Sequence, residues 1–237
     1  MRFAMAVMAA GLAVPMLAQA ANGFGGEATL GYLSTNGNSK TSSLNAKLSL
    51  NYTEVQWKNA FVATALGASS QNTSTAERYT ADDQYNYNLT PQDFAFANAD
   101  YVKDLFDAVG QRTTETVGYG RHFLTGPVYI LDGQVGVGAR QMRYNVSNQR
   151  TSDGILQLGG LFAWKISDTS TFSETPKLEY GASNTYFESV TELKMNIVGN
   201  LFAGLSYTLR HNSIVPSGTG KTDTVTAANI SYAFGAK

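Results

Sequence analysis

The feature that most constrains this chain is an alternation of apolar and polar residues with a period of two. Between Leu44 and Tyr52 the even positions read Leu, Ala, Leu, Leu, Tyr, while the odd positions read Asn, Lys, Ser, Asn. Successive side chains of a strand point to opposite faces of a sheet, so this segment has one apolar face and one polar face. The same division recurs at 129–140, 201–210 and 229–234. The pattern favours antiparallel strands and argues against long amphipathic helices.

Polar breaks of two kinds alternate between these runs. Short breaks carry turn residues, and long breaks are richer in Ser, Thr, Asn and Asp. Strands placed between the breaks number about twelve, with roughly 18 residues for each strand and its connection, which is enough for the 9 to 11 residues that cross a bilayer at a tilt. The short breaks are 53–56, 90–93, 125–127, 167–169 and 198–200, and the long ones are 35–40, 69–76, 104–111, 143–152 and 213–221, with 182–184 in a long-break position.

The composition decides between a membrane barrel and a soluble sandwich. Only 15% of residues are charged, and the apolar faces combine many of the 23 Gly with 13 Tyr and 12 Phe. A soluble sandwich of this size would carry more Val, Ile and Leu inside and more charge outside. Tyrosines end the apolar faces, as the interfacial girdle of a membrane barrel does; these are Tyr79, Tyr85, Tyr87, Tyr119, Tyr207 and Tyr232.

We therefore predict an all-β fold, a transmembrane antiparallel β-barrel of about twelve strands, in residues 21–237. A closed barrel is how a sheet satisfies all its backbone groups in lipid. The register of 57–70 stays open because the side chains on both of its faces are small. That of 112–123 stays open because Val117 and Tyr119 lie on the same face as Glu115 and Arg121. A soluble antiparallel sheet is the alternative.

The first twenty residues predict export. Arg2 precedes an uncharged apolar stretch at 3–17, and Ala18-Gln19-Ala20 supplies the small residues that a signal peptidase reads. We predict a signal peptide at 1–20, cleaved after Ala20, and a destination in the bacterial outer membrane reached through the periplasm. The alternative is an uncleaved membrane anchor, but the apolar run is shorter than the roughly 20 residues of a spanning helix.

Charge and cysteine content remove several classes of function. The chain carries 17 Lys and Arg against 18 Asp and Glu, and it has no Cys. A near-neutral chain lacks the basic surface that nucleic acid requires, so we expect no nucleic-acid partner. Without Cys there is no disulfide framework, thiolate zinc site or catalytic thiol. With only two His as well, we expect no metal site and no cofactor.

Three motifs resemble catalytic or nucleotide-binding sequences. The segment 217–222 (SGTGKT) looks like a phosphate-binding loop, but position 215 is Val where that motif needs Gly, and a strand is expected to follow it. The glycine pairs at 118–120 and 136–138 lie inside strands and indicate close wall packing. His211 and Ser213 share one strand face, as in lipid hydrolases where His takes the hydroxyl proton. Asp223, the nearest candidate to orient that His, is expected to point into the lumen.

Several stretches of the sequence resemble one family. The segments 26–32 (GEATLGY), 36–39 (NGNS) and 43–45 (SLN) are similar to the YdiY-like family of salt-induced outer-membrane proteins, which is catalogued as a domain of unknown function. Similarity continues through Trp57, 77–79, 89–91, 104–106, 118–121, 136–138 and 222–234. The resemblance implies an outer-membrane barrel with no established activity. The chain departs from outer-membrane proteins that end on an aromatic residue, because Gly235, Ala236 and Lys237 follow Phe234.

Charged residues on the polar strand faces are predicted to line the lumen. The cations are Lys47, Arg78, Arg140, Lys177, Lys194 and Arg210, and the anions are Asp82, Asp100, Asp132, Glu179, Glu188, Glu192 and Asp223. A strongly selective pore would show a ladder of one sign. This balanced lining predicts either weak ion selectivity or salt bridges that close the lumen.

Three functional hypotheses follow. The first is a narrow passive channel or structural envelope barrel without catalysis, in contact with the outer-membrane lipid and with small solutes or ions. The second is an acyl or lipid hydrolase that uses His211 and Ser213. The third is a non-conducting barrel that presents external loops for binding. In each case the barrel-assembly machinery is an expected partner, through the last strand and its aromatic residue Phe234.

Overall fold

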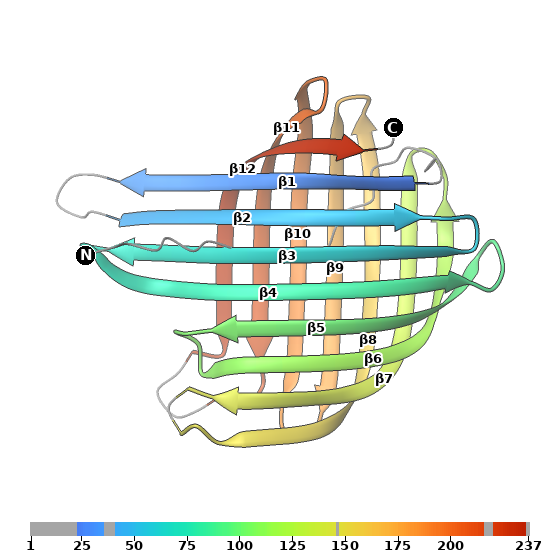
Figure 1. The fold of residues 1–237 in the computed structure, drawn as a ribbon. Coiled ribbons are helices and arrows are strands. Elements are labelled where there is room, and N and C mark those ends of the chain that lie inside the picture. Colours follow the sequence, from blue (N-terminus) through green and yellow to red (C-terminus); the bar gives the residue numbers. More distant parts are fainter. Residues whose placement is uncertain (1–22, 36–40, 146, 216–219, 236–237) are drawn as a thin grey trace.

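The chain forms a closed barrel of twelve antiparallel strands in a computed structural model that describes residues 23–35, 41–145, 147–215 and 220–235 (Figure 1). Each strand pairs with its neighbours in sequence, and β1 pairs with β12 to close the sheet. The strands are β1 (Gly23–Thr35), β2 (Thr41–Thr53), β3 (Trp57–Ser70), β4 (Thr73–Asn88), β5 (Asp93–Asp104), β6 (Val109–Thr125), β7 (Tyr129–Tyr144), β8 (Arg150–Ser167), β9 (Ser170–Gly181), β10 (Thr185–Val198), β11 (Leu201–Asn212) and β12 (Thr222–Gly235). The predicted all-β barrel is confirmed. The predicted signal segment 1–20 lies outside the described residues.

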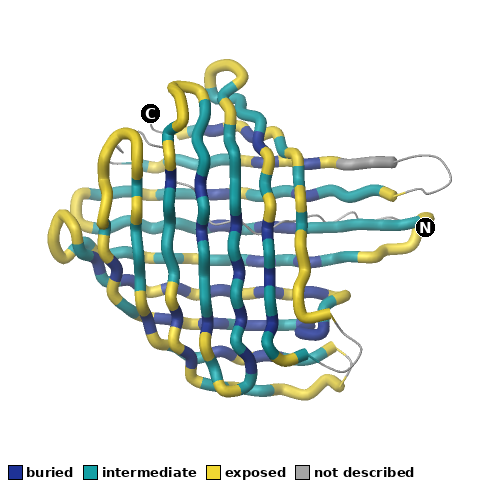
Figure 2. The backbone as a smooth tube through the Cα atoms, turned by 180° about the vertical axis from the view of Figure 1, so that it is seen from behind, coloured by how far each residue is buried: buried dark blue, intermediate teal, exposed yellow. Residues whose placement is uncertain are grey.

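The two faces of the sheet differ in polarity in the way the period-two pattern predicts. Residues paired across strands share a face, and the face that turns outward carries exposed Leu30, Leu48 and Val117. The face that turns inward carries buried Asn45 and Thr114. Figure 2 shows this as alternating buried and less buried positions along several strands, β5 among them. The polar side chains are therefore enclosed, and the large apolar ones lie outside.

Aromatic side chains gather on the outward face at the ends of strands. Trp57 stacks between Tyr52 and Tyr85, with ring centroids 5.1 and 5.4 Å away. Tyr129 stacks on Trp164 at 6.3 Å, close to two further short connections. Amphipathic rings in this position suit the boundary between lipid and water. Within the described residues, no helix is long and apolar enough to span a membrane.

The predicted long breaks are shorter than expected. The segment 69–76 is mostly strand, because β3 runs to Ser70 and β4 begins at Thr73, with Gln71 and Asn72 between them at φ angles of 49° and 65°. Two consecutive residues with positive φ form the tight hairpin turn that matches strand twist. Likewise 104–111 contracts to a connection at 105–108, and 143–152 to 145–149. Many polar residues of these segments belong to exposed strand ends that still pair with the neighbouring strand. Polar residues therefore do not mark where the sheet ends.

The structure gives the register of the two strands that the sequence left open. In β3, Val62 and Thr64 are buried on the lumen side. In β6, Val117 and Glu115 share the outward face, so the residues between them turn inward. That register also places Arg112 in the lumen, where it is only 6% exposed.

Glycines of β6 and β7 make room for two inward phenylalanines of β5. Phe94 and Phe96 are 3% and 4% exposed. A Cβ on Gly120 would lie 2.1 Å from the Phe94 ring, and one on Gly136 would lie 2.8 Å from the Phe96 ring. The interpretation of these glycines as wall-packing positions is confirmed. They also let an apolar cluster fill one side of the lumen.

Candidate functional site

The lumen holds the charged side chains that the sequence analysis selected. Register places all of them on the inward-facing side of their strands, although their exposure differs. Arg78, Asp100, Arg140, Glu179, Glu188 and Arg210 are buried, Lys47, Asp82, Asp132, Lys177, Glu192 and Lys194 are half-buried, and Asp223 is exposed near the start of β12. Burial of so many ionic groups requires that each finds a partner.

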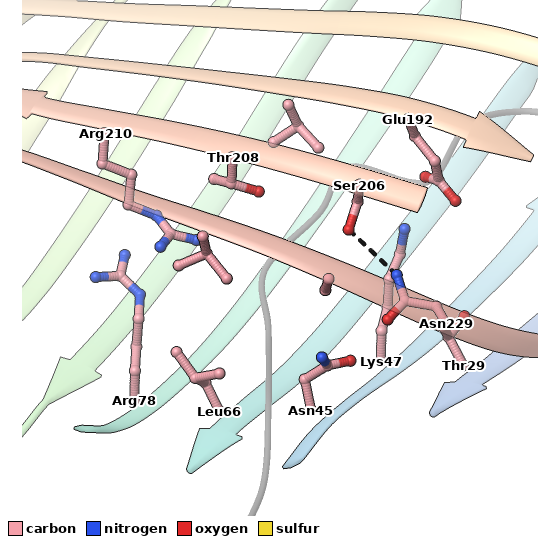
Figure 3. Close-up of a pocket in the computed structure, with 13 residues that line it drawn as sticks. Thr29, Asn45, Lys47, Leu66, Arg78, Glu192, Ser206, Thr208, Arg210 and Asn229 are labelled. Atoms are coloured by element: carbon pink, nitrogen blue, oxygen red, sulfur yellow. Dashed lines mark hydrogen bonds between the residues drawn. The ribbon is translucent and has the colours of Figure 1, made fainter. Parts of the chain in front are cut away.

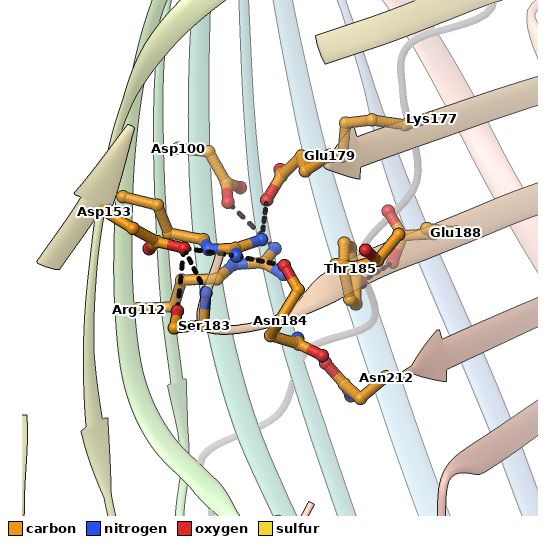
Figure 4. A network of polar contacts seen from close by, with 12 residues as sticks. Asp100, Arg112, Asp153, Lys177, Glu179, Ser183, Asn184, Thr185, Glu188 and Asn212 are labelled. Atoms are coloured by element: carbon orange, nitrogen blue, oxygen red, sulfur yellow. Dashed lines mark hydrogen bonds and ion pairs between the residues drawn. The ribbon is translucent and has the colours of Figure 1, made fainter. Parts of the chain in front are cut away.

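Arg140 of β7 is the centre of the most enclosed group. Its side chain is 0% exposed, and its Nη1 donates to Glu179 Oε2 at 3.3 Å. Its Nη2 donates to Asp153 Oδ2 at 3.3 Å and to the backbone carbonyl of Asn184 (Figure 4). Asp153 accepts two more hydrogen bonds, from the backbone N and the hydroxyl of Ser183, at 2.9 and 2.8 Å. The short connection between β9 and β10 is thereby tied to the lumen wall.

A second arginine crosses the lumen. Arg112 of β6 donates to Asp100 Oδ1 at 3.1 Å, and its guanidinium carbon lies 4.0 Å from the ring centroid of Tyr186 on β10. Strands β7, β8 and β9 separate β6 from β10 in the sheet, so this cation–π contact spans the interior. Tyr186 in turn donates its hydroxyl to Glu188 at 2.9 Å, and Glu188 pairs with Arg210 at 2.7 Å. We call this connected group, Asp100, Arg112, Tyr186, Glu188 and Arg210, the cross-lumen bridge.

Further contacts join non-adjacent strands inside the lumen. Lys194 of β10 pairs with Glu27 of β1 across β11 and β12. Gln84 of β4 donates to Gln134 of β7 at 3.2 Å across β5 and β6. Side chains therefore meet at several places in the interior besides the bridge.

The connection between β5 and β6 is held by Asp104, the last residue of β5. Asp104, which pairs with Arg78 at 3.2 Å, also accepts hydrogen bonds from the backbone N of Phe106 and Asp107 at 2.9 Å each. Burial, and then the nearby Asp104 carboxylate, raise the pKa of Asp107. Because the protonated carboxyl is favoured there, this connection is more stable at low pH, and that advantage is lost as pH rises through the raised pKa.

Several of these partners were not among the residues predicted to line the lumen. Arg112 lies in the segment with open register, Asp104 falls in the predicted break 104–111, and Asp153 comes directly after the predicted break 143–152. Asp104 could have been found, because it continues the alternation of Asn98 and Asp100 on one face of β5. Nothing in the sequence marks the remaining partners, which are Glu27, Tyr186 and Asn184.

His211 and Ser213 each form hydrogen bonds with other residues. His211 Nδ1 lies 2.8 Å from Thr222 Oγ1. The Ser213 hydroxyl accepts a hydrogen bond from the backbone N of Thr185 at 2.8 Å and donates to Asn184 Oδ1 at 3.2 Å. Among the described residues no hydrogen bond joins His211 to Ser213. Asp223 is opposite Arg210 and shares its lumen face, as expected. The geometry gives the hydrolase alternative no support.

Other motifs lie apart from the lumen chemistry. Residues 216–219 of the segment that resembles a phosphate-binding loop lie outside the described residues, and the segment leads into β12, a strand. Within the described ranges, no cluster of three or more His, Asp or Glu side chains could hold a metal ion.

Comparisons with known proteins agree with this architecture. A family model described as "Protein of unknown function, DUF481" matches residues 28–234. The chain is 30% identical over 223 residues to "Uncharacterized protein YdiY" of Escherichia coli strain K12, which covers 92% of this chain and 86% of that protein.

Solved structures resemble the chain in fold. One, described as "NanC porin structure in rhombohedral crystal form", has a TM-score of 0.52 at 13% identity and covers 89% of this chain and 99% of that one. Another, the COG4313 outer membrane channel from Pseudomonas putida F1, has a TM-score of 0.51 at 12% identity, with 94% and 97% covered. The chain therefore shares its fold with one protein described as a porin and another described as an outer membrane channel.

Proposed function

The chain belongs to DUF481, a family of proteins of unknown function, and on that premise we propose that it is a narrow outer-membrane channel that the cross-lumen bridge keeps nearly closed at rest. Residues 1–20 direct its export in this proposal. The assembly machinery recognises β12, whose Phe234 packs 6.3 Å from Phe24 at the seam with β1. The barrel fold shared with proteins described as a porin and an outer membrane channel is compatible with this function.

The observation that carries the proposal is the contact of Arg112 with Tyr186 across the interior. A hydrated ion moving along the axis must displace that contact or pass beside it. The salt bridge of Arg112 with Asp100 offers a passing anion the guanidinium and a passing cation the carboxylate. Since both signs line the path, the channel selects weakly between them.

Removing the bridge pair should raise the conductance several-fold. In the double variant Arg112→Ala, Asp100→Ala both charges go together, so neither partner is left buried and unpaired. The measurement is single-channel current of the refolded mature chain, residues 21–237, across a planar bilayer at several salt gradients. We expect small, rare openings of weak ion preference for the wild type and larger, persistent ones for the variant.

The matched control removes an Arg–Asp pair from the outer wall. Arg121 and Asp93 lie 2.9 Å apart on the outward face, so Arg121→Ala with Asp93→Ala changes the same chemistry without touching the lumen. It should conduct like the wild type. If wild type and bridge variant both fold and neither conducts, the channel is refuted and a non-conducting barrel that presents its loops takes its place.

A lipid-release assay tests the hydrolase alternative directly. Because the Ser213 hydroxyl already serves Thr185 and Asn184, we expect Ser213→Ala to leave any lipid release from vesicles unchanged. A loss of release in that variant, with Ser189→Ala unaffected, would instead identify Ser213 as a nucleophile.

A further inference from the structure

A cavity lined by both polar and apolar side chains lies in the lumen beside the cross-lumen bridge. It has a volume of about 40 Å³ and is lined from β1 to β4 on one side and from β10 to β12 on the other. A water needs at least about 10 to 15 Å³ on this measure, so the cavity accommodates a few waters or one small ionic group. Figure 3 shows that hydroxyl, amide and charged side chains reach into it.

Two arginines from well-separated strands face each other across this cavity. Arg78 comes from β4 and Arg210 from β11, and their guanidinium groups lie at the same end of it (Figure 3). Like charges repel, so this approach needs compensation. Each arginine has one carboxylate partner, Asp104 at 3.2 Å from Arg78 Nη1 and Glu188 at 2.7 Å from Arg210 Nε. Neither carboxylate belongs to the cavity lining.

Donor capacity remains on both arginines after these pairings. A guanidinium has five N–H donors. Arg78 is 7% exposed, and its Nε is buried without a hydrogen-bond partner in the described part of the chain. Arg210 is 5% exposed, and its Nε donates a hydrogen bond to Glu188, which leaves its two Nη groups. A buried donor without an acceptor is costly, which favours an acceptor that the protein itself does not supply.

The other end of the cavity has a different character. Asn229 donates to Ser206 Oγ at 3.1 Å, and its Oδ1 is a buried acceptor without a partner among the described residues. Lys47 and Glu192 also line this end, so one cation and one anion face each other there (Figure 3). The two guanidinium groups, with their remaining N–H donors, are therefore confined to the Arg78 and Arg210 end, while their carboxylate partners lie outside the lining.

We propose that Arg78 and Arg210 form a binding site for a small oxyanion, a carboxylate or a phosphate, in the lumen. Planar guanidinium groups bind two oxygens of such an anion at once, and two of them can share it. The role of the site rests on the proposed function, since the bound anion would be a resting point for anions that cross the barrel. Binding itself requires only the folded barrel.

Direct titration tests the site. The refolded barrel is titrated with ¹³C-acetate and, separately, with inorganic phosphate, while NMR line widths of the anion are recorded in constant ionic strength. We expect saturable broadening with at least one of them. Broadening by acetate alone identifies a carboxylate site, and broadening by phosphate alone identifies a phosphate site. Absence of saturable broadening with either anion, in protein that is shown to be folded by its heat-dependent gel mobility, overturns the proposal.

Variants locate the binding. Arg78→Gln combined with Asp104→Asn removes the pair together and should weaken binding about tenfold, the loss of one charge-assisted hydrogen bond or more. Arg78→Lys keeps the charge and removes Nε, so it should also weaken binding if the planar guanidinium geometry is required. This variant takes over the test if the double variant does not fold. Arg121→Lys on the outward face is the control. Unchanged affinity in both Arg78 variants would also overturn the proposal.

The outcome is separable from that of the channel. Acetate or phosphate binding in a barrel that never conducts would leave the oxyanion site standing and remove the channel. Conductance without saturable binding would support the channel and overturn the oxyanion site.

Discussion

Replacing Arg140 with Met should lower the free energy of unfolding by about 3 to 5 kcal/mol, the usual cost of breaking a buried ion pair from one side. Met fills much of the same space but offers no donors. Asp153 would then lose its arginine partner, and Glu179, which is 1% exposed, would keep only the more distant Lys177 at 3.7 Å. The backbone carbonyl of Asn184 would lose its donor as well. Urea unfolding of the lipid-reconstituted barrel, followed by the fluorescence of Trp57 and Trp164, measures the loss.

The control for that experiment is Arg143→Met, three residues along the same strand. Arg143 pairs in register with Arg150 on the outward side, so the same substitution there should change stability by less than about 0.5 kcal/mol. Removing Asp153 as well, in Arg140→Met with Asp153→Asn, should recover part of the loss, because one cation and one anion then leave together and Glu179 keeps its ion pair with Lys177 at 3.7 Å. A loss below about 1 kcal/mol for Arg140→Met alone would contradict the account of Arg140 as the centre of the network.

The architecture was open to prediction because it depends on the outward face. Leu48 and its apolar neighbours on β2 must all face one side, and a shift of one residue would turn every one of them inward. That rule predicts the inward position of charges such as Lys47 and Arg210, and the polar breaks between the alternating runs predict the number of strands. The assignment of faces can be made for one strand without information about any other strand.

The interior was less predictable because its contacts join strands that are distant in sequence. Phe94 and Phe96 point inward while Ala95, Ala97 and Ala99 of the same strand point outward. Hydrophobicity alone would place the rings on the apolar outer wall. Their positions depend on glycines of β6 and β7, which only the pairing of the sheet brings beside β5.

Arg112 illustrates the same limit for the candidate site. The outward face of β6 carries Glu115 and Arg121 beside Val117, so neither of its faces is uniformly apolar. The register of an isolated strand with two mixed faces is weakly specified. It becomes fixed only when Asp100 of β5 and Tyr186 of β10 supply partners for the guanidinium.

A single methyl group on Gly118 should cost about 3 kcal/mol of folding free energy, the upper end of the range for overpacking. A Cβ there would lie 2.2 Å from the carbonyl oxygen of Val135, 2.6 Å from the Cα of Gly136 and 2.7 Å from the Phe96 ring. The ring can turn aside, but the two backbone atoms belong to the paired strand β7. The β6–β7 ladder would therefore have to separate locally, which weakens the wall and releases the Phe96 cluster.

Gly204→Ala tests whether that cost comes from the clash or from the loss of a strand glycine in general. Gly204 lies within β11, and a Cβ there would meet its nearest atom, Glu192 Oε1, at the ordinary contact distance of 3.6 Å. Alanine limits the freedom of the unfolded chain more than glycine does, so Gly204→Ala should leave stability unchanged or raise it by up to about 1 kcal/mol. Heat-dependent gel mobility and urea unfolding report both variants under the same conditions. If Gly118→Ala folds as well as Gly204→Ala, the wall between β6 and β7 is not closely packed at Gly118, and the inward position of Phe96 needs another explanation.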